Sequence, residues 1–305
     1  MTTYIIKRLV QSIGALLVAV SLVFALIHST GDPVTMMLGE NATQEDIERI
    51  SKELGLDKPV AVQYILFLSR LLHGDIGESF RHRRPVSELI SSRLLPTLQL
   101  AGFALLLSLG IGLPAGLIAA IRRNSLLDQS LMILTIAGLA IPRFWLGLML
   151  ILGLGLTVPW LPVSGRGSFA HLVLPGVALA VPSAARLTRF VRTGVLEVIN
   201  KEYITTARAK GLPSRTVICK HVLRPALLAP VTDLALELGA LIGQTVVIEV
   251  VFAWPGVGRL AIEAIWARDY PVIMGFVITL SIVYILLSLI ADLVVGWLDP
   301  RIVYS

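Results

Sequence analysis

Charged residues and cysteine are both scarce in this sequence. Asp, Glu, Lys and Arg together make up 15% of the 305 residues, whereas hydrophobic residues make up 55%. Soluble proteins carry roughly 25% charged residues, so a soluble globular fold does not account for this composition. The only cysteine is Cys219. The chain therefore has no disulfide framework and no pair of cysteines to hold a metal ion.

The motifs of several enzyme classes are also missing. The sequence contains no G-x-x-x-x-G-K-[ST] phosphate loop, so we do not expect the chain itself to bind or hydrolyse ATP. The motifs H-E-x-x-H, G-x-S-x-G and C-x-x-C are absent too, which argues against metalloprotease, hydrolase and thiol-redox activity. The histidines are scattered along the chain. The sequence therefore predicts no catalytic site, no bound cofactor and no metal site.

Long apolar segments dominate the sequence instead. A membrane-spanning helix needs about 20 mostly apolar residues. Three such segments carry little or no charge: 9–27, 98–121 and 272–291. Three more contain prolines or charged side chains: 131–158, 172–190 and 226–252. Breaks are expected at the prolines Pro142, Pro175 and Pro182. Close helix crossings are expected at two G-x-x-x-G spacings, Gly112–Gly116 and Gly239–Gly243. The sequence therefore predicts an all-α, polytopic membrane protein with six transmembrane helices.

Six charged residues lie inside the less apolar segments: Arg143, Arg186, Arg189, Asp233, Glu237 and Glu249. Arg143, Asp233, Glu237 and Glu249 are the candidates to line a pathway. Because a charge against lipid costs several kcal/mol, their helices should face other helices or a water-filled cavity. This predicts a bundle that encloses a pathway, and helix packing alone is the alternative. Asp233 and Glu237 are four residues apart on one helix face. They either serve a proton or cation relay or face a partner helix or a hydrated cavity.

The Lys and Arg residues of the short loops predict the orientation in the membrane. The N-terminal stretch contains Lys7 and Arg8 and is expected in the cytoplasm, so six spans return the C-terminus to the cytoplasm as well. The long loop 29–96 then lies outside. The cytoplasmic loop after the fourth span is rich in basic residues: Arg192, Lys201, Arg208, Lys210, Arg215, Lys220 and Arg224. The net charge of +6 therefore indicates membrane topology and not nucleic-acid binding.

The outer loop has the pattern of a small helical cap. One helix is predicted to begin at Thr43 and to end at Gly55, a second to cover residues 60–72, and a third to begin at Pro85. The expected organisation is 1–96 for the first span and the cap, 97–298 for a five-helix core with a cytoplasmic docking loop at 193–225, and 299–305 for a cytoplasmic tail.

The cytoplasmic loop is predicted to be a helix–glycine–helix unit. Residues 197–210 favour a helix, Gly211 is expected to end it, and Pro213 can start another. Ala207 and Ala209 are small and would permit the close approach of a partner surface. The alternative is a solvated loop whose basic residues only set the topology. Because topology requires no such folded unit, the pattern favours docking.

At this loop the sequence resembles a known family. Residues 202–212 (EYITTARAKGL) and 221–225 (HVLRP) are similar to the coupling-loop signature of ATP-binding cassette importer permeases, and more narrowly to the dipeptide, oligopeptide and nickel permease group. Further matches follow in order: GDP at 31–33, LGLDKP at 54–59, GDIGES at 74–79, RPV at 84–86, PTL at 96–98, FAWPGVGR at 252–259, RDYPV at 268–272 and DPR at 299–301.

The chain departs in places from the general importer signature E-A-A-x3-G-x9-I-x-L-P. Thr205 and Thr206 stand at its first two positions, His221 stands at the isoleucine position, and the final proline is displaced to Pro225. These departures bear on which residues make contact with a partner, and docking of the loop is still expected.

The resemblance implies a division of labour between subunits in the cytoplasmic or inner membrane of a bacterium or archaeon. A second homologous permease would pair with this chain to form the pathway for small peptides. Two ATPase subunits, which carry ATP and Mg²⁺, would dock on the cytoplasmic loops, and an external binding protein would deliver the substrate. This chain would then be no enzyme, but part of an ATP-driven translocase.

The resemblance also assigns roles to particular residues. The ATPase-docking residues are expected to be Glu202, Ala207, Arg208, Ala209, Lys210, Gly211 and Leu212. An outer gate or a contact with the binding protein is expected in the short loop between the fifth and sixth spans, at Trp254, Gly256, Arg259 and Asp269. Interfacial anchoring is the alternative for Trp254.

Two other functions fit parts of the sequence. A nickel or other metal-chelate importer would share the fold and the loop motifs. An ion-coupled secondary transporter would use Asp233, Glu237 and Glu249 as a relay. Such transporters often contain two repeated halves with paired broken helices, and no convincing internal repeat is present in this sequence.

Overall fold

The computed structural model describes residues 2–30, 43–45, 51–52 and 57–298. These residues are almost entirely helical, and the described part of the chain contains no β-strand, only an isolated bridge between Glu78 and Pro85. The predicted all-α class is confirmed. The chain divides into two compact units, which are Met1–Leu95 with Gly256–Ile285 (the first unit) and Pro96–Pro255 with Leu286–Ser305 (the second unit).

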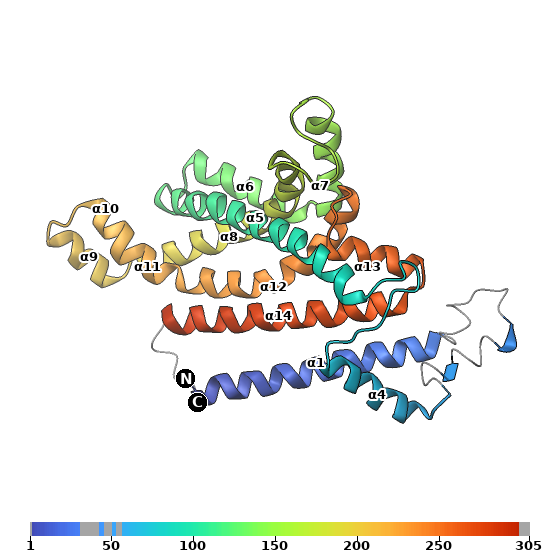
Figure 1. The fold of residues 1–305 in the computed structure, drawn as a ribbon. Helices are drawn as coiled ribbons and strands as arrows, with labels where there is room; N and C mark the ends of the chain where they lie inside the picture. The colour runs from blue at the N-terminus through green and yellow to red at the C-terminus, as the bar shows by residue number, and fades with distance from the viewer. Residues whose placement is uncertain (1, 31–42, 46–50, 53–56, 299–305) are drawn as a thin grey trace. The chain divides into compact units, whose positions relative to one another are not determined.

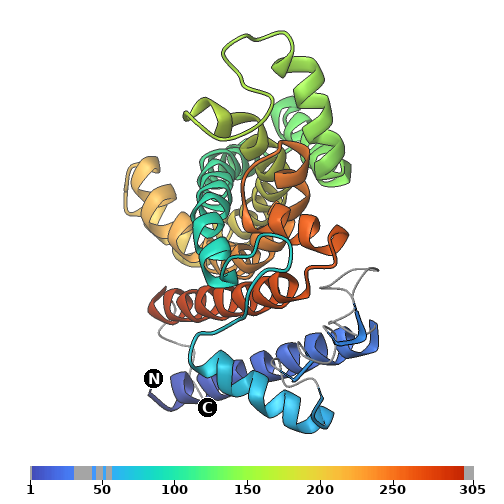
Figure 2. The same ribbon diagram turned by 45° about the vertical axis from the view of Figure 1, so that its right-hand side comes forward.

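In the first unit, α1 (Thr2–Thr30) lies beside α4 (Val60–Leu72), as Figures 1 and 2 both show. The Phe24 ring of α1 lies edge-on to Tyr64 of α4, with 5.2 Å between centroids, and stacks on Phe67 at 5.7 Å. The bounds of α4 coincide with the predicted second cap helix. Most of the predicted helix 43–55 lies outside the described residues, and the cap as a whole stays a prediction.

A small apolar core holds the rest of the first unit. The start of α5 (Val86–Ile121) packs on α13 (Val257–Trp266) and on the start of α14 (Tyr270–Leu298). The buried residues are Val86, Leu89, Ile90, Val257, Leu260, Ala264 and Val272. The sequence predicted a short loop where α13 stands. That prediction is wrong, because the apolar residues of this segment recur at helical spacing and cover one face.

The second unit contains most of the apolar helices. They are the rest of α5, α6 (Leu126–Ala140), α7 (Arg143–Leu150) with the π-helical turn η1 (Ile151–Gly155), α8 (Ala170–Ile199) and α12 (Leu228–Val251). Four short helices join α8 to α12: α9 (Glu202–Ala209), α10 (Ser214–Thr216), η2 (Val217–Val222) and α11 (Leu223–Ala226).

Three helices of the described chain are long and apolar enough to cross a membrane. They lie at Val86–Ile121, Ala170–Ile199 and Tyr270–Ala291. The pair Leu126–Ala140 and Arg143–Gly155 makes a fourth if it counts as one bent span. The first predicted span, 9–27, falls within α1, which is 29 residues long, and the fifth, 226–252, contains the whole of α12, which is 24 residues long. A count of six spans stays a prediction.

The prolines act differently in neighbouring helices. The chain bends by 104° between α6 and α7, where Ile141 is extended and Pro142 precedes the first residue of α7. The expected break at Pro142 is therefore confirmed. By contrast, α8 runs unbroken through Pro175 and Pro182, so the breaks predicted there are wrong.

One of the two G-x-x-x-G spacings marks a close helix crossing within the second unit. A Cβ atom added to Gly116 would lie 2.6 Å from the Thr188 carbonyl oxygen and 2.7 Å from the Val191 Cβ, both of α8. At Gly112 it would lie 2.9 Å from the Leu187 Cβ. The crossing of α5 on α8 is thus confirmed. A Cβ at Gly243 would meet no described atom within 4 Å, so Gly243 makes no close crossing with the described residues, and the crossing expected at Gly239 stays a prediction.

Candidate functional site

The cytoplasmic loop forms a packed elbow at one end of the second unit, beyond α8 and α12 in Figure 1. The helix predicted over 197–210 is interrupted, because α8 ends at Ile199 and α9 begins at Glu202. Gly211 ends α9 with φ +74°, as predicted. Its N–H donates to the Arg208 carbonyl at 2.9 Å, and the Leu212 N–H donates to the Ala207 carbonyl at 3.4 Å. These two bonds make a Schellman stop, which requires the positive φ that glycine tolerates.

The two faces of α9 have different surroundings. Ile204 and Ala207 are buried in a cluster that includes Val217 and Val222 of η2 and Val195 of α8. The tip of the elbow, defined here as Arg208–Leu212, is exposed, and Glu202 is exposed at the start of α9. The expectation that Ala207 touches a partner is therefore corrected, since its side chain already packs within the chain.

A bidentate ion pair joins Asp128 of α6 to Arg192, which lies near the end of α8 that leads into the elbow. The Asp128 side chain is buried, and its two oxygens accept from Arg192 Nε at 2.7 Å and Nη2 at 2.9 Å. Ser125 caps α6 by accepting from the Asp128 N–H, and the Asn124 N–H donates to Asp128. Sequence reasoning missed this pair. The S-x-x-D spacing just before a predicted span signals the helix start that positions Asp128, but not its pairing with Arg192.

A buried polar cluster joins α7, α8 and α12. Glu237 of α12 is 6% exposed and accepts from Ser183 Oγ at 2.8 Å and from Arg186 Nη1 at 3.0 Å, both on α8. Arg143, the first residue of α7, places Nη2 3.6 Å from Glu237 Oε1. The half-exposed Arg186 also lies 3.3 Å from Asp233. Three of the four predicted pathway residues therefore meet in one place.

Glu249, the fourth predicted pathway residue, lies elsewhere on α12. It is fully buried and accepts from Thr97 Oγ1 at 2.7 Å and from Thr245 Oγ1 at 3.1 Å. Twelve residues separate it from Glu237, which is about 18 Å along a helix with a rise of 1.5 Å per residue. Of the three acidic residues of the predicted relay, Asp233 and Glu237 share Arg186 as a partner, whereas Glu249 lies apart from them.

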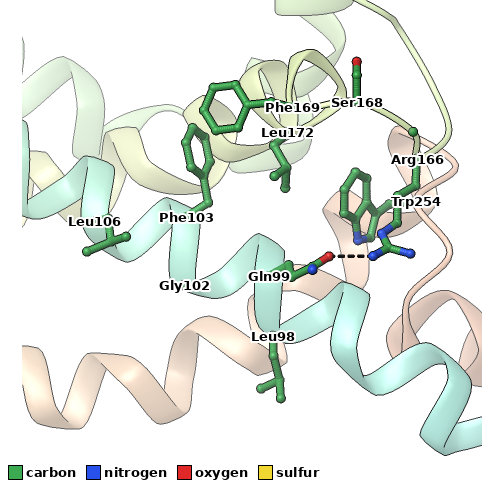
Figure 3. Close-up of a pocket in the computed structure, with 11 residues that line it drawn as sticks. Leu98, Gln99, Gly102, Phe103, Leu106, Arg166, Ser168, Phe169, Leu172 and Trp254 are labelled. Atoms are coloured by element: carbon green, nitrogen blue, oxygen red, sulfur yellow. Dashed lines mark hydrogen bonds between the residues drawn. The ribbon is translucent and has the colours of Figure 1, made fainter.

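Trp254 is buried at the other end of the second unit, 1% exposed. Its indole N–H donates to the Pro96 carbonyl at 3.0 Å. The ring forms part of the wall of a cavity of about 410 Å³ (Figure 3). In this cavity Arg166 donates to Gln99 at 2.8 Å. Because the ring is covered by its own chain, interfacial anchoring at the surface does not describe Trp254.

The other residues of the predicted outer site lie in the first unit. Gly256 is buried where α13 begins, and Arg259 bonds to Glu263 at 2.8 Å one turn further along. Asp269 is 1% exposed and accepts from Ser79 Oγ at 2.5 Å. The expectation that the Asp269 side chain touches a partner directly is therefore corrected, because this side chain is buried and bonded within the first unit.

The fold and these sites define a class of protein, a helical membrane protein with polar groups buried between its apolar helices. The chain overlays on two inward-facing crystal forms of the MetNI methionine ABC transporter with TM-scores of 0.57 and 0.60, at 22% identity, over 69% of this chain and 96% of the matched chain. The family model described as "Binding-protein-dependent transport system inner membrane component" matches residues 112–304. The model of the N-terminal part of the same membrane component matches residues 1–101.

Curated relatives match over the full length. The glutathione transport system permease proteins GsiC of Escherichia coli K12 and of Salmonella paratyphi A are each 38% identical over 306 residues, which covers 100% of both chains. The chain belongs to the family of binding-protein-dependent transport system inner membrane components, as a permease subunit of an ATP-binding cassette importer. It is a multi-pass protein of the inner membrane.

Proposed function

We propose that this chain forms half of a translocation pathway for small peptides and that a second homologous permease forms the other half. Two ATPase subunits bind ATP and Mg²⁺ on the cytoplasmic side, and an external binding protein delivers the substrate. The full-length similarity to permeases named for glutathione, itself a small peptide, supports the substrate class. Both termini lie in the cytoplasm in this proposal, and residues 29–96 lie outside.

The observation that carries the ATPase-docking part of the proposal is the exposed tip of the elbow. Arg208–Leu212 is exposed next to a fixed face of α9, where Ile204 and Ala207 are buried in one cluster with residues of η2 and α8. A tip held by a Schellman stop presents one shape to a partner and loses little conformational entropy on binding. The same packing gives a mechanical path, because a push on α9 passes through Ile204 and Ala207 to α8.

In the transport cycle, closure of the ATPases on ATP moves the elbow, and the elbow biases the pathway between two states of access. The polar cluster around Glu237 lies between α7, α8 and α12, which are three of the helices that such a movement would shift. This role requires no catalysis by the chain itself.

Bulky substitutions at the tip test the docking. We expect Gly211→Val, which strains a residue at φ +74°, and Ala209→Trp, which pushes the surfaces apart, to reduce co-purification of the ATPase and substrate-stimulated ATP hydrolysis by tenfold or so. Lys210→Ala is the control, because an exposed ion pair contributes about 0–1 kcal/mol. Normal assembly and transport by both bulky variants would show that the loop only sets topology.

Uptake into proteoliposomes tests the substrate class. The complete complex, with its binding protein and ATP inside, should accumulate radiolabelled glutathione or dipeptides, and omission of the binding protein should abolish the accumulation. The matched measurement uses a radiolabelled nickel chelate in the same vesicles. Accumulation of nickel without accumulation of any peptide would contradict the proposal and favour the metal-chelate alternative.

A further inference from the structure

The segment between Gly77 and Val86 folds into a small hairpin-like turn in the first unit. The Ser79 N–H donates to the Arg84 carbonyl at 2.9 Å, and the Arg83 N–H donates back to the Ser79 carbonyl at 2.9 Å. The Val86 N–H closes the turn on the Gly77 carbonyl at 3.0 Å. Its tip exposes four consecutive basic residues, Arg81, His82, Arg83 and Arg84, which we call the basic turn.

The buried carboxylate of Asp269 holds the basic turn from behind. Its Oδ2 accepts from Ser79 Oγ at 2.5 Å and from the Arg81 N–H at 3.2 Å, and its Oδ1 accepts from the Phe80 N–H at 3.1 Å. The Ser79 hydroxyl oxygen in turn accepts from the His82 N–H at 2.9 Å. Hydrogen bonds to an ionised group are about twice as strong as neutral ones. One residue far along the chain therefore fixes the base of this turn.

The backbone on both sides of this contact is in a conformation that non-glycine residues rarely adopt. Arg83 has φ +50°, and Arg268, next to Asp269, has φ +54°. Such conformations are strained for residues other than glycine and persist only where the surroundings determine them. The turn is thus held in one shape at an energetic cost, while its four basic side chains stay exposed.

The charges of the basic turn are only partly compensated. Arg84 pairs with Glu88 one turn into α5. Within the described part of the chain, neither Arg81 nor Arg83 lies in salt-bridge contact with a carboxylate. Two guanidinium groups on a fixed, exposed turn are suited to carboxylates, which they can bind bidentately.

We infer that the basic turn is the docking point for an acidic patch on the external binding protein, and that Asp269 is the positioning residue that presents it. The inference rests on the proposed function, which places residues 29–96 outside. An anionic membrane surface is the less suitable partner, because it attracts basic segments that need no fixed shape. A preformed turn instead saves ordering entropy when it meets a shaped protein surface.

Charge reversal tests the inference on the complete complex in nanodiscs of zwitterionic lipid. The probe is the external binding protein that stimulates the ATPase of the wild-type complex, labelled with a fluorophore. Exposed interface charges act mainly on the association rate and its salt dependence. We expect Arg81→Glu with Arg83→Glu to lower the association rate about tenfold at low salt, and the difference to shrink as salt is added. Arg70→Glu, an exposed charge reversal on α4, is the control and should leave the rate within twofold.

A second variant tests whether the position of the basic turn matters as well as its charge. Asp269→Asn keeps all four basic residues but removes the carboxylate, so we expect a smaller fall in association rate together with faster tryptic cleavage after Arg81 and Arg83. Asp269→Glu, which restores the charge, should recover part of both. Association that is unchanged in the double reversal, or lowered equally by Arg70→Glu, would overturn the inference. A wild-type complex that binds no binding protein would instead refute the proposed function.

Discussion

Asp233 and Glu237 are four residues apart on one helix face, but they differ in burial. Substitution of each by its amide should therefore cost different amounts of stability. The Glu237 side chain is 5% exposed and meets Ser183 and two arginines. The Asp233 side chain is 18% exposed, and the ion pair that it forms among the described residues is with Arg186, which is 51% exposed. Loss of one partner of a buried pair costs about 3–5 kcal/mol, whereas loss of an exposed pair costs about 0–1 kcal/mol.

The difference in stability between the two variants can be measured as a difference in the apparent melting temperature of the purified complex. At about 2–4 °C per kcal/mol, Glu237→Gln should lower the apparent melting temperature by about 6–12 °C, because the glutamine keeps a bond to Ser183 and the cost stays near 3 kcal/mol. Asp233→Asn should lower it by about 0–4 °C. The measurement is the fraction of complex that stays monodisperse after heating in detergent.

A double variant tests whether the cost comes from the uncompensated charge. Glu237→Met combined with Arg143→Met removes both partners of the buried pair. The double variant should therefore lose less stability than the sum of the losses in Glu237→Met and in Arg143→Met. Equal destabilisation by Asp233→Asn and Glu237→Gln would refute the reasoning. Loss of uptake in Asp233→Asn at an unchanged melting temperature would instead support the relay alternative.

Two further outcomes are expected. Gly116→Ala should lower the melting temperature by a few degrees, because its Cβ would lie 2.6 Å from the Thr188 carbonyl oxygen and overpacking costs about 1–3 kcal/mol; Gly110→Ala on the same helix, whose Cβ meets no atom within 4 Å, should not. Glu45→Cys in a Cys219→Ser background should react with an impermeant thiol reagent added to whole cells, and labelling only after membrane disruption would contradict the proposed orientation.

Local signals in the sequence predicted local structure well. Apolar residues at helical spacing defined α4 at its observed bounds, and the glycine after a short polar helix predicted the stop at Gly211. In both places the deciding interactions are within a few residues of each other: the periodicity of one helix face, and the two hydrogen bonds of a Schellman stop. The small-residue spacing at Gly112–Gly116 likewise predicted a close crossing, although not the helix that it crosses.

Contacts between distant segments were not predictable in the same way. Trp254 precedes Pro255 and Gly256, Asp269 stands between Arg268 and Tyr270, and both were expected in a loop at the surface. Their burial depends on acceptors and donors more than 150 residues away, the Pro96 carbonyl for Trp254 and the Ser79 turn for Asp269. A single sequence contains no signal for such a pairing. The same holds for Arg186, whose role in the cluster follows only from the packing of α8 on α12.

The contrast between Pro142 and Pro182 follows from what neighbouring helices supply. A proline inside a helix removes one N–H donor and crowds the preceding turn, and membrane helices tolerate this only where other groups bond the disturbed carbonyls. In the turn before Pro182, Ser108 donates to the Ala180 carbonyl at 3.1 Å and Arg143 donates to the Leu179 carbonyl at 3.0 Å. Arg143 occupies that position because the chain breaks at Pro142. The Ala178 carbonyl, which loses its helical donor to Pro182, stands immediately before these two carbonyls in the chain. Arg143, next to Pro142, therefore bonds α8 beside the turn that Pro182 disturbs, and each proline stands next to a residue that contacts Glu237, namely Arg143 and Ser183.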